Sequence, residues 1–198
     1  MRHQTYGYLP SRRASPPFDR DQIILLCANS VVQLLESFKL YSHLYADDTQ
    51  IYGFCRPGDT DSLRKRIANG VAAVADWMRS NRFQLNASKT EVLWCASARR
   101  QSQLPSDPLA VGSDLPLPVS CVRDLGIIVD ADPTMRTQVT QTCLKCFAAL
   151  RQLQSLRRSV SNDVMQSLIV ALVFSRLDYG SATLAGLPKQ LMDRLQSV

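Results

Sequence analysis

Residues 44–52 read Leu-Tyr-Ala-Asp-Asp-Thr-Gln-Ile-Tyr and set two adjacent carboxylates between two short runs rich in β-branched and aromatic residues. Such runs favour β-strands. Neighbouring side chains of a regular strand point to opposite faces, so Asp47 and Asp48 can serve one site only where the backbone turns. The pattern therefore predicts a β-hairpin with both aspartates at its tip.

Two carboxylates at such a tip are hard oxygen ligands of the kind that Mg²⁺ takes, while water and substrate phosphates complete its coordination. The chain is rich in aspartate, since only Glu36 and Glu91 among its 17 acidic residues are glutamate. One Asp-Asp pair is therefore expected about once by chance. Asp47 and Asp48 are candidate Mg²⁺ ligands whose interpretation depends on the sequence that follows them.

The order of motifs along the chain resembles the reverse transcriptase of non-LTR (LINE-type) retrotransposons. Residues 45–48 (YADD) are similar to the catalytic motif of the polymerase palm, and residues 85–91 (LNASKTE) to the next palm motif. Residues 122–130 (VRDLGIIVD) are similar to the hairpin that holds the primer end, and residues 176–180 (RLDYG) to a stretch on the thumb side. The resemblance extends over roughly residues 24–198 and is specific because several motifs occur in the right order.

This resemblance implies RNA-directed DNA synthesis by two-metal nucleotidyl transfer, with Mg²⁺ as cofactor and an RNA or DNA primer–template and dNTP as partners. It gives Asp47 and Asp48 a catalytic role as metal ligands and places Tyr45 at the nucleic acid. Lys89 matches the lysine that lies near the incoming triphosphate in this family. A solvated lysine at the entrance of a strand explains Lys89 equally well.

The chain also departs from the family. It contains no Gly-x-Pro-Gln-Gly sequence, and no strand that would supply a third catalytic carboxylate is evident before Asp47. We therefore expect a truncated product that enters the palm midway, binds Mg²⁺ weakly and has little or no polymerase activity. The alternatives are a non-enzymatic nucleic-acid-binding remnant and a chain that does not fold stably, because half a palm exposes a sheet edge.

The composition limits the classes of protein to which the chain can belong. The 198 residues are 45% hydrophobic, and their net charge of +6 is compatible with a polyanionic partner. Six scattered cysteines without a preceding signal peptide favour reduced thiols in an intracellular protein of the nucleus or cytoplasm. Cys143 and Cys146 fall on an apolar helical stripe, which favours core packing over zinc binding. The apolar run near Val170 is too short to span a membrane.

The hydrophobic pattern predicts an α+β fold in three parts. Residues 1–24 are expected to be a disordered or non-homologous leader, residues 25–132 a partial palm, and residues 133–198 a helical thumb-like module. The expected elements are helices over about 25–38 and 60–80, strands near 90–95 and 125–129, and two helices after residue 133, the second following Ser161.

Four further residues are candidates for contact with nucleic acid. Gly126 would permit the close approach of a primer strand, or it marks a β-bulge. Arg151, Arg157 and Arg158 near the end of the first predicted thumb helix would reach phosphates. Arginines in this position also suit the negative end of the helix dipole, and we prefer that explanation.

Overall fold

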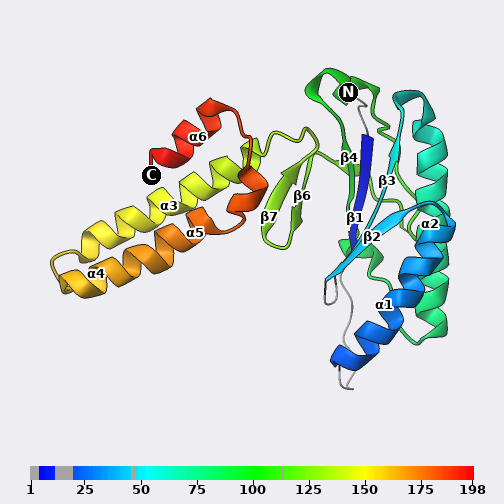
Figure 1. Cartoon of the computed structure of the whole chain (residues 1–198), viewed down its shortest axis with the longest axis horizontal. Coiled ribbons are helices and arrows are strands. Elements are labelled where there is room, and N and C mark those ends of the chain that lie inside the picture. Colours follow the sequence, from blue (N-terminus) through cyan, green and yellow to red (C-terminus); the bar gives the residue numbers. More distant parts are fainter. Residues whose placement is uncertain (1–4, 12–19, 46–47, 113) are drawn as a thin grey trace. The chain divides into compact units, whose positions relative to one another are not determined.

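The computed structural model describes residues 5–11, 20–45, 48–112 and 114–198, with the backbone alone for 5–11 and 20–28. It has the mixed helix and sheet content expected from the sequence (Figure 1). The chain divides into two compact units. The first comprises Met1–Val122 with Ala131–Pro133, and the second comprises Arg123–Asp130 with Thr134–Val198.

The first unit is built on a five-stranded sheet with the order β2-β3-β1-β4-β5. Neighbours from β2 to β4 are antiparallel, and β5 pairs with β4 in parallel. The chain order β1-α1-β2-β3-α2-β4 thus forms two interleaved crossovers, an arrangement known as the split βαβ fold. The strands are β1 (Thr5–Ser11), β2 (Tyr41–Tyr45), β3 (Asp48–Cys55), β4 (Val92–Cys95) and β5 (Pro118–Val119).

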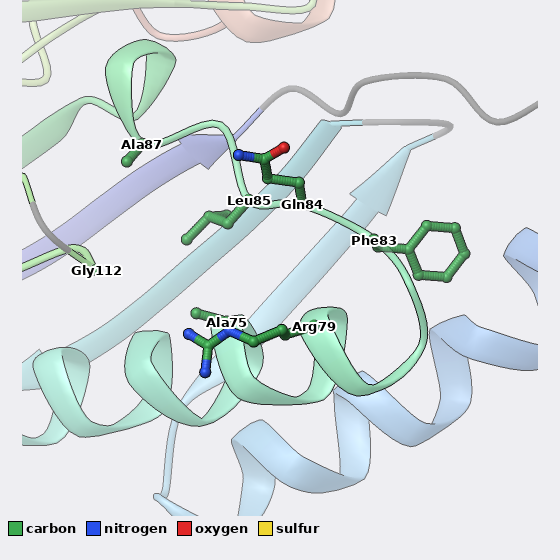
Figure 2. Close-up of a pocket in the computed structure, with 7 residues that line it drawn as sticks. All are labelled: Ala75, Arg79, Phe83, Gln84, Leu85, Ala87 and Gly112. Carbon is green, nitrogen blue, oxygen red and sulfur yellow. The ribbon is translucent and has the colours of Figure 1, made fainter.

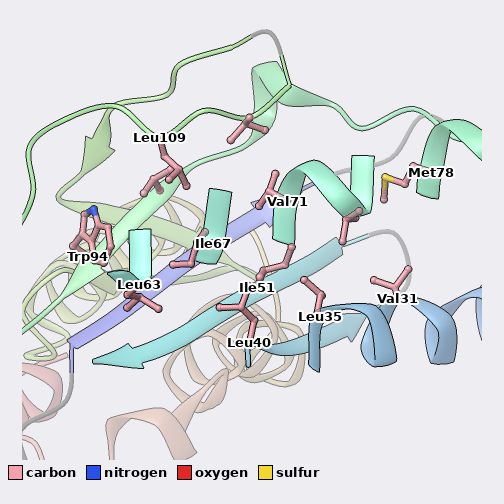
Figure 3. Packing of buried hydrophobic residues seen from close by; sticks show 13 residues of the cluster. Val31, Leu35, Leu40, Ile51, Leu63, Ile67, Val71, Met78, Trp94 and Leu109 are labelled. Atoms are coloured by element: carbon pink, nitrogen blue, oxygen red, sulfur yellow. The ribbon is translucent and has the colours of Figure 1, made fainter. Parts of the chain in front are cut away.

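Helices α1 (Arg20–Ser37) and α2 (Thr60–Ser80) cover one face of this sheet (Figure 3). The predicted helix over 60–80 is confirmed, and its apolar stripe packs on the sheet as the spacing indicates. One continuous core joins the two helices, β3 and β4. Its largest members include Leu35, Leu40, Ile51, Leu63, Ile67, Val71, Met78 and Trp94, all at most 4% exposed.

Both helices end in the same way. Lys39 and Arg82 adopt positive φ angles of 56° and 60°, which turns the chain sharply after each helix. The next residue donates its N–H to the carbonyl five positions back, from Leu40 to Leu35 and from Phe83 to Met78. These are Schellman C-caps, in which the residue after the left-handed position packs back on the helix. The first of them delivers Leu40 into the core directly before β2.

Residues 1–24 were expected to be a disordered or non-homologous leader, and the structure corrects the expected disorder within residues 5–11 and 20–24. Residues Thr5–Ser11 form β1, the middle strand of the sheet, and α1 begins at Arg20. Seven residues of β1 pair with β3 and three with β4. Thr5, Tyr6 and Tyr8 favour a strand, but Gly7 and Pro10 oppose one, so the local strand signal is weak. Pairing with strands distant in the sequence decides its structure.

The second unit combines a β-hairpin with a helical module. Strands β6 (Cys121–Asp124) and β7 (Ile127–Asp130) form the hairpin. The hydrophobic pattern predicted only one strand, over 125–129, whereas the resemblance implied a hairpin over 122–130. Gln138 Oε1 accepts the Ile128 N–H at 2.9 Å, and Asp130 Oδ2 accepts the Thr137 N–H at 3.0 Å. These bonds tie β7 to the first turn of α3, so the hairpin belongs with the helices that follow it.

The helices after residue 133 match the prediction of two long helical segments. They are α3 (Arg136–Leu156), and α4 (Asn162–Ile169) continued through a π-helical turn (Val170–Phe174) into α5 (Ser175–Asp178), followed by α6 (Lys189–Gln196). Cys143 and Cys146 are at most 2% exposed and pack into apolar clusters, as expected for core residues. No helix among the described residues is long and apolar enough to cross a membrane.

Candidate nucleic-acid interface

The YADD segment lies at a two-residue hairpin turn. Tyr45, the last residue of β2, pairs with Asp48, the first residue of β3, so Ala46 and Asp47 alone connect the strands. The predicted hairpin is therefore confirmed. Asp48 is half-buried, and Tyr45 is 65% exposed on the same face of the sheet. Asp47 lies outside the described residues.

Lys89 reaches the same end of the sheet from a different element. It closes a short 3₁₀ turn (Ala87–Lys89) directly before β4 and is exposed. Ser11 of β1 pairs with Thr49 near the hairpin tip, and Tyr8 pairs with Leu93, so the chain before β4 lies toward the Ser11 end. Lys89 and Asp48 thus lie at the same end of the sheet.

The face of the sheet opposite the helices carries a cluster of aromatic rings that the sequence reasoning missed. Tyr52 of β3 stacks between His43 and Tyr41 of β2, with centroid separations of 5.1 and 5.6 Å and interplanar angles of 20° and 24°. The Tyr52 hydroxyl and His43 Nε2 are hydrogen-bonded at 2.8 Å. Phe54 meets the Tyr41 ring at 5.4 Å and 56°. The alternation of ring residues within each strand was the available signal.

The hairpin of the second unit is held at its turn by Tyr179. Leu125 and Gly126 form this turn with φ angles of 45° and 90°, conformations that favour glycine. The Tyr179 hydroxyl donates to the Leu125 carbonyl. A Cβ at position 126 would lie 3.3 Å from Cε1 of the Tyr179 ring. Gly126 is thus a turn residue packed under Tyr179, and not a bulge.

The three candidate arginines of the second unit are exposed. Arg151 lies within α3, and Arg157 and Arg158 form the turn that follows it. Their positions fit both phosphate binding and the favourable interaction with a helix C-terminus. The second unit contains nine basic and five acidic side chains, so it carries +4 of the +6 net charge.

A cavity of about 450 Å³ lies beside the 3₁₀ turn Ala87–Lys89, and Ala87 forms part of its lining (Figure 2). Its size falls within the usual range of small-molecule sites. The cation in its wall, Arg79, pairs with Asp76 at 3.0 Å. Because Arg79 is already paired with Asp76, the cavity offers no unpaired cation to a ligand. Its lining therefore does not indicate which class of ligand it would bind. Its lining comprises Ala75, Arg79, Phe83, Gln84, Leu85, Ala87 and Gly112.

Potential metal ligands are dispersed in the part of the chain that the structure describes. No group of three or more His, Cys, Asp or Glu side chains gathers there. Cys95 at the end of β4 is partly buried, and this desolvation raises the pKa of its thiol to about 11. Cys95 is therefore a protonated, unreactive thiol at neutral pH.

Comparisons of the chain with protein-family models, curated proteins and solved structures gave no match. The class of protein that the described residues define is an α+β protein with a split βαβ unit and a helical unit. Its function is inferred below from the hairpin, the ring cluster and the distribution of charge.

Proposed function

We propose that this chain is a reverse-transcriptase fragment, with the first unit as palm and the second as the primer-holding hairpin and thumb. RNA-directed DNA synthesis is then the ancestral reaction. The observation that carries the proposal is the pair Tyr45–Asp48, which fixes a Tyr-Ala-Asp-Asp sequence at the tip of a hairpin in a split βαβ sheet. Lys89, from the second motif of the resemblance, lies at the same end of the sheet.

The available carboxylates do not fit a two-metal site. Two-metal nucleotidyl transfer requires carboxylates that converge from more than one strand. The strands on either side of β3 are β1 and β2, and neither contains an aspartate or glutamate. Asp47 and Asp48 would hold at most one Mg²⁺ ion, together with water and phosphate oxygens. We therefore propose that this chain does not polymerise DNA.

Primer extension tests this proposal directly. The purified chain, incubated with a primed RNA or DNA template, dNTPs and Mg²⁺ or Mn²⁺, is expected to give no extended product, because the two strands beside β3 supply no third carboxylate. A complete reverse transcriptase in parallel verifies the assay. Extension that disappears in both Asp47→Asn and Asp48→Asn would show that the two hairpin carboxylates suffice and would contradict the proposed inactivity.

The alternative function is that of a non-enzymatic nucleic-acid-binding protein. The charge distribution favours it, because the second unit holds +4 of the net charge and exposes Arg157 and Arg158 side by side. Phosphate neutralisation releases counterions, so binding that uses these residues must weaken as salt rises. The two functions are compatible, since a chain without polymerase activity can retain a grip on a primer–template.

Charge reversal at Arg157 and Arg158 is the corresponding test. The double variant Arg157→Glu/Arg158→Glu is expected to weaken binding of a primer–template and to flatten the slope of log K against log salt by about 1.5, at roughly 0.7 to 0.9 for each lost phosphate contact. Anisotropy titrations at several salt concentrations measure both quantities. The control is Arg99→Glu, a charge reversal at an exposed arginine of the first unit. An unchanged slope in the double variant would contradict a role for this turn.

A further inference from the structure

The ring cluster on the open face of the sheet has a defined order. His43, Tyr52 and Tyr41 form a row of nearly parallel rings, in which the end rings are exposed and the middle ring is half-buried. Phe54 lies at an angle beside the Tyr41 end. Among the described rings none stacks on the outer side of His43. On this face of β2 the exposed Tyr45 follows His43 toward the hairpin tip.

The spacing between His43 and Tyr45 along β2 suits the insertion of one flat ring. Residues two apart in a strand are about 6.6–6.8 Å apart and share a face. His43 and Tyr45 are such a pair, and Tyr45 is 65% exposed. Stacked bases are spaced about 3.4 Å apart, so a base inserted between two rings needs a separation of about 6.8 Å. The Cα spacing of His43 and Tyr45 along β2 thus equals the separation that two rings need to hold one base between them.

We propose that this row is a stacking platform for the bases of single-stranded nucleic acid, with one base inserted between His43 and Tyr45. The inference rests on the proposed nucleic-acid-binding function and assigns it a base-contacting surface in the first unit. Sheets with helices on one face and exposed aromatic side chains on the other bind single strands in this way. Stacking is tolerant of sequence because every base presents a π-face.

The chemistry of the platform favours nucleic acid over an apolar protein partner. Its exposed rings are tyrosine and histidine, whose polar edges stay hydrated while their faces stack. Cations lie at the Tyr41 end, where the Arg66 guanidinium donates to the Lys39 and Phe54 carbonyls at 3.2 and 3.4 Å. Lys39, just before β2, and Arg56, just after β3, are exposed and would meet the phosphates that follow a stacked base. Arg66 belongs to α2, and the nearby acidic side chains are Glu36 at the end of α1 and Asp59 before α2.

The test measures binding of a short fluorescein-labelled oligoadenylate to the full chain by anisotropy. His43→Ala and Tyr45→Ala are each expected to raise Kd about 5- to 150-fold, the range for loss of one base–aromatic stack. Tyr45→Phe keeps the ring and is expected to bind like the parent. Phe174→Ala removes a ring that is 57% exposed in the second unit and serves as the matched control.

Two further measurements separate stacking from contact with phosphates. The slope of log K against log salt is expected to be the same in His43→Ala and in the parent, because no phosphate contact is lost. An abasic oligonucleotide of equal length is expected to bind as weakly as oligoadenylate binds the His43→Ala variant. Equal affinity of the parent for both probes, or an unchanged Kd in His43→Ala, overturns the platform alone. Absence of any binding at low salt overturns the platform and the nucleic-acid-binding function, whereas the primer-extension result bears on neither.

Discussion

Deletion of residues 1–11 is expected to abolish the cooperative unfolding transition of the first unit. This deletion removes β1, which lies between β3 and β4 and pairs with both. Without it, β3 and β4 each lose one of their two hydrogen-bonded neighbours, and buried backbone groups left unpaired are costly. A flexible leader, by contrast, could be removed with almost no loss of stability.

Tryptophan fluorescence measures this effect selectively. The chain has two tryptophans, Trp77 and Trp94, and both lie in the first unit. A urea titration followed by tryptophan emission should show one transition for the full chain and none for the deletion variant. Circular dichroism in the same samples should retain helical signal from the second unit.

A point substitution provides a finer version of the same test. Tyr8 pairs with Tyr52 on one side and with Leu93 on the other. Tyr8→Pro removes an N–H from the middle of the sheet and is expected to destabilise the first unit severely, whereas Tyr8→Phe keeps the backbone donor. A tryptophan transition unchanged by the deletion or by Tyr8→Pro would show that β1 does not support the sheet.

Leu63→Ala is expected to lower the free energy of unfolding of the first unit by about 2–5 kcal/mol, the usual cost of truncating a fully buried leucine. The Leu63 side chain is 0% exposed and fills the space above Gly53, where a Cβ would lie 2.6 Å from Leu63 Cδ1. Its removal therefore leaves a cavity where α2 packs on β3. The same tryptophan-monitored urea titration gives the change in stability.

Leu115→Ala is the control for Leu63→Ala, because Leu115 belongs to the same unit and is 64% exposed. Its truncation is expected to change stability by no more than about 0.5 kcal/mol. Equal, small effects of both substitutions would mean that α2 is not packed on the sheet. That result would support the reading of this sequence as a chain that does not fold stably.

The candidate site was predictable where its signals are local. The hairpin follows from the strand-forming residues on either side of Asp47 and Asp48. The pair Tyr45–Asp48 confirms the register between β2 and β3 that a two-residue turn requires. Helix α2 was predictable because the stripe from Leu63 to Met78 repeats with helical period. The ring cluster was only partly predictable from local signals. Alternation within each strand predicts which side chains share a face of the sheet, but the neighbours of Tyr52 depend on the register between β2 and β3.

The sequence by itself determined the elements whose residues interact with near neighbours in the chain, namely the Tyr45–Asp48 hairpin, the long helices and the burial of Cys143 and Cys146. Only the tertiary structure decided that residues 5–11 form the central strand, because their hydrogen bonds go to β3 and β4, more than 30 residues away. It also decided that Tyr179 closes over the turn at Gly126, a contact between residues 53 positions apart. Periodicity reports the face that a residue presents, whereas the partner on that face is selected by packing and pairing across the fold.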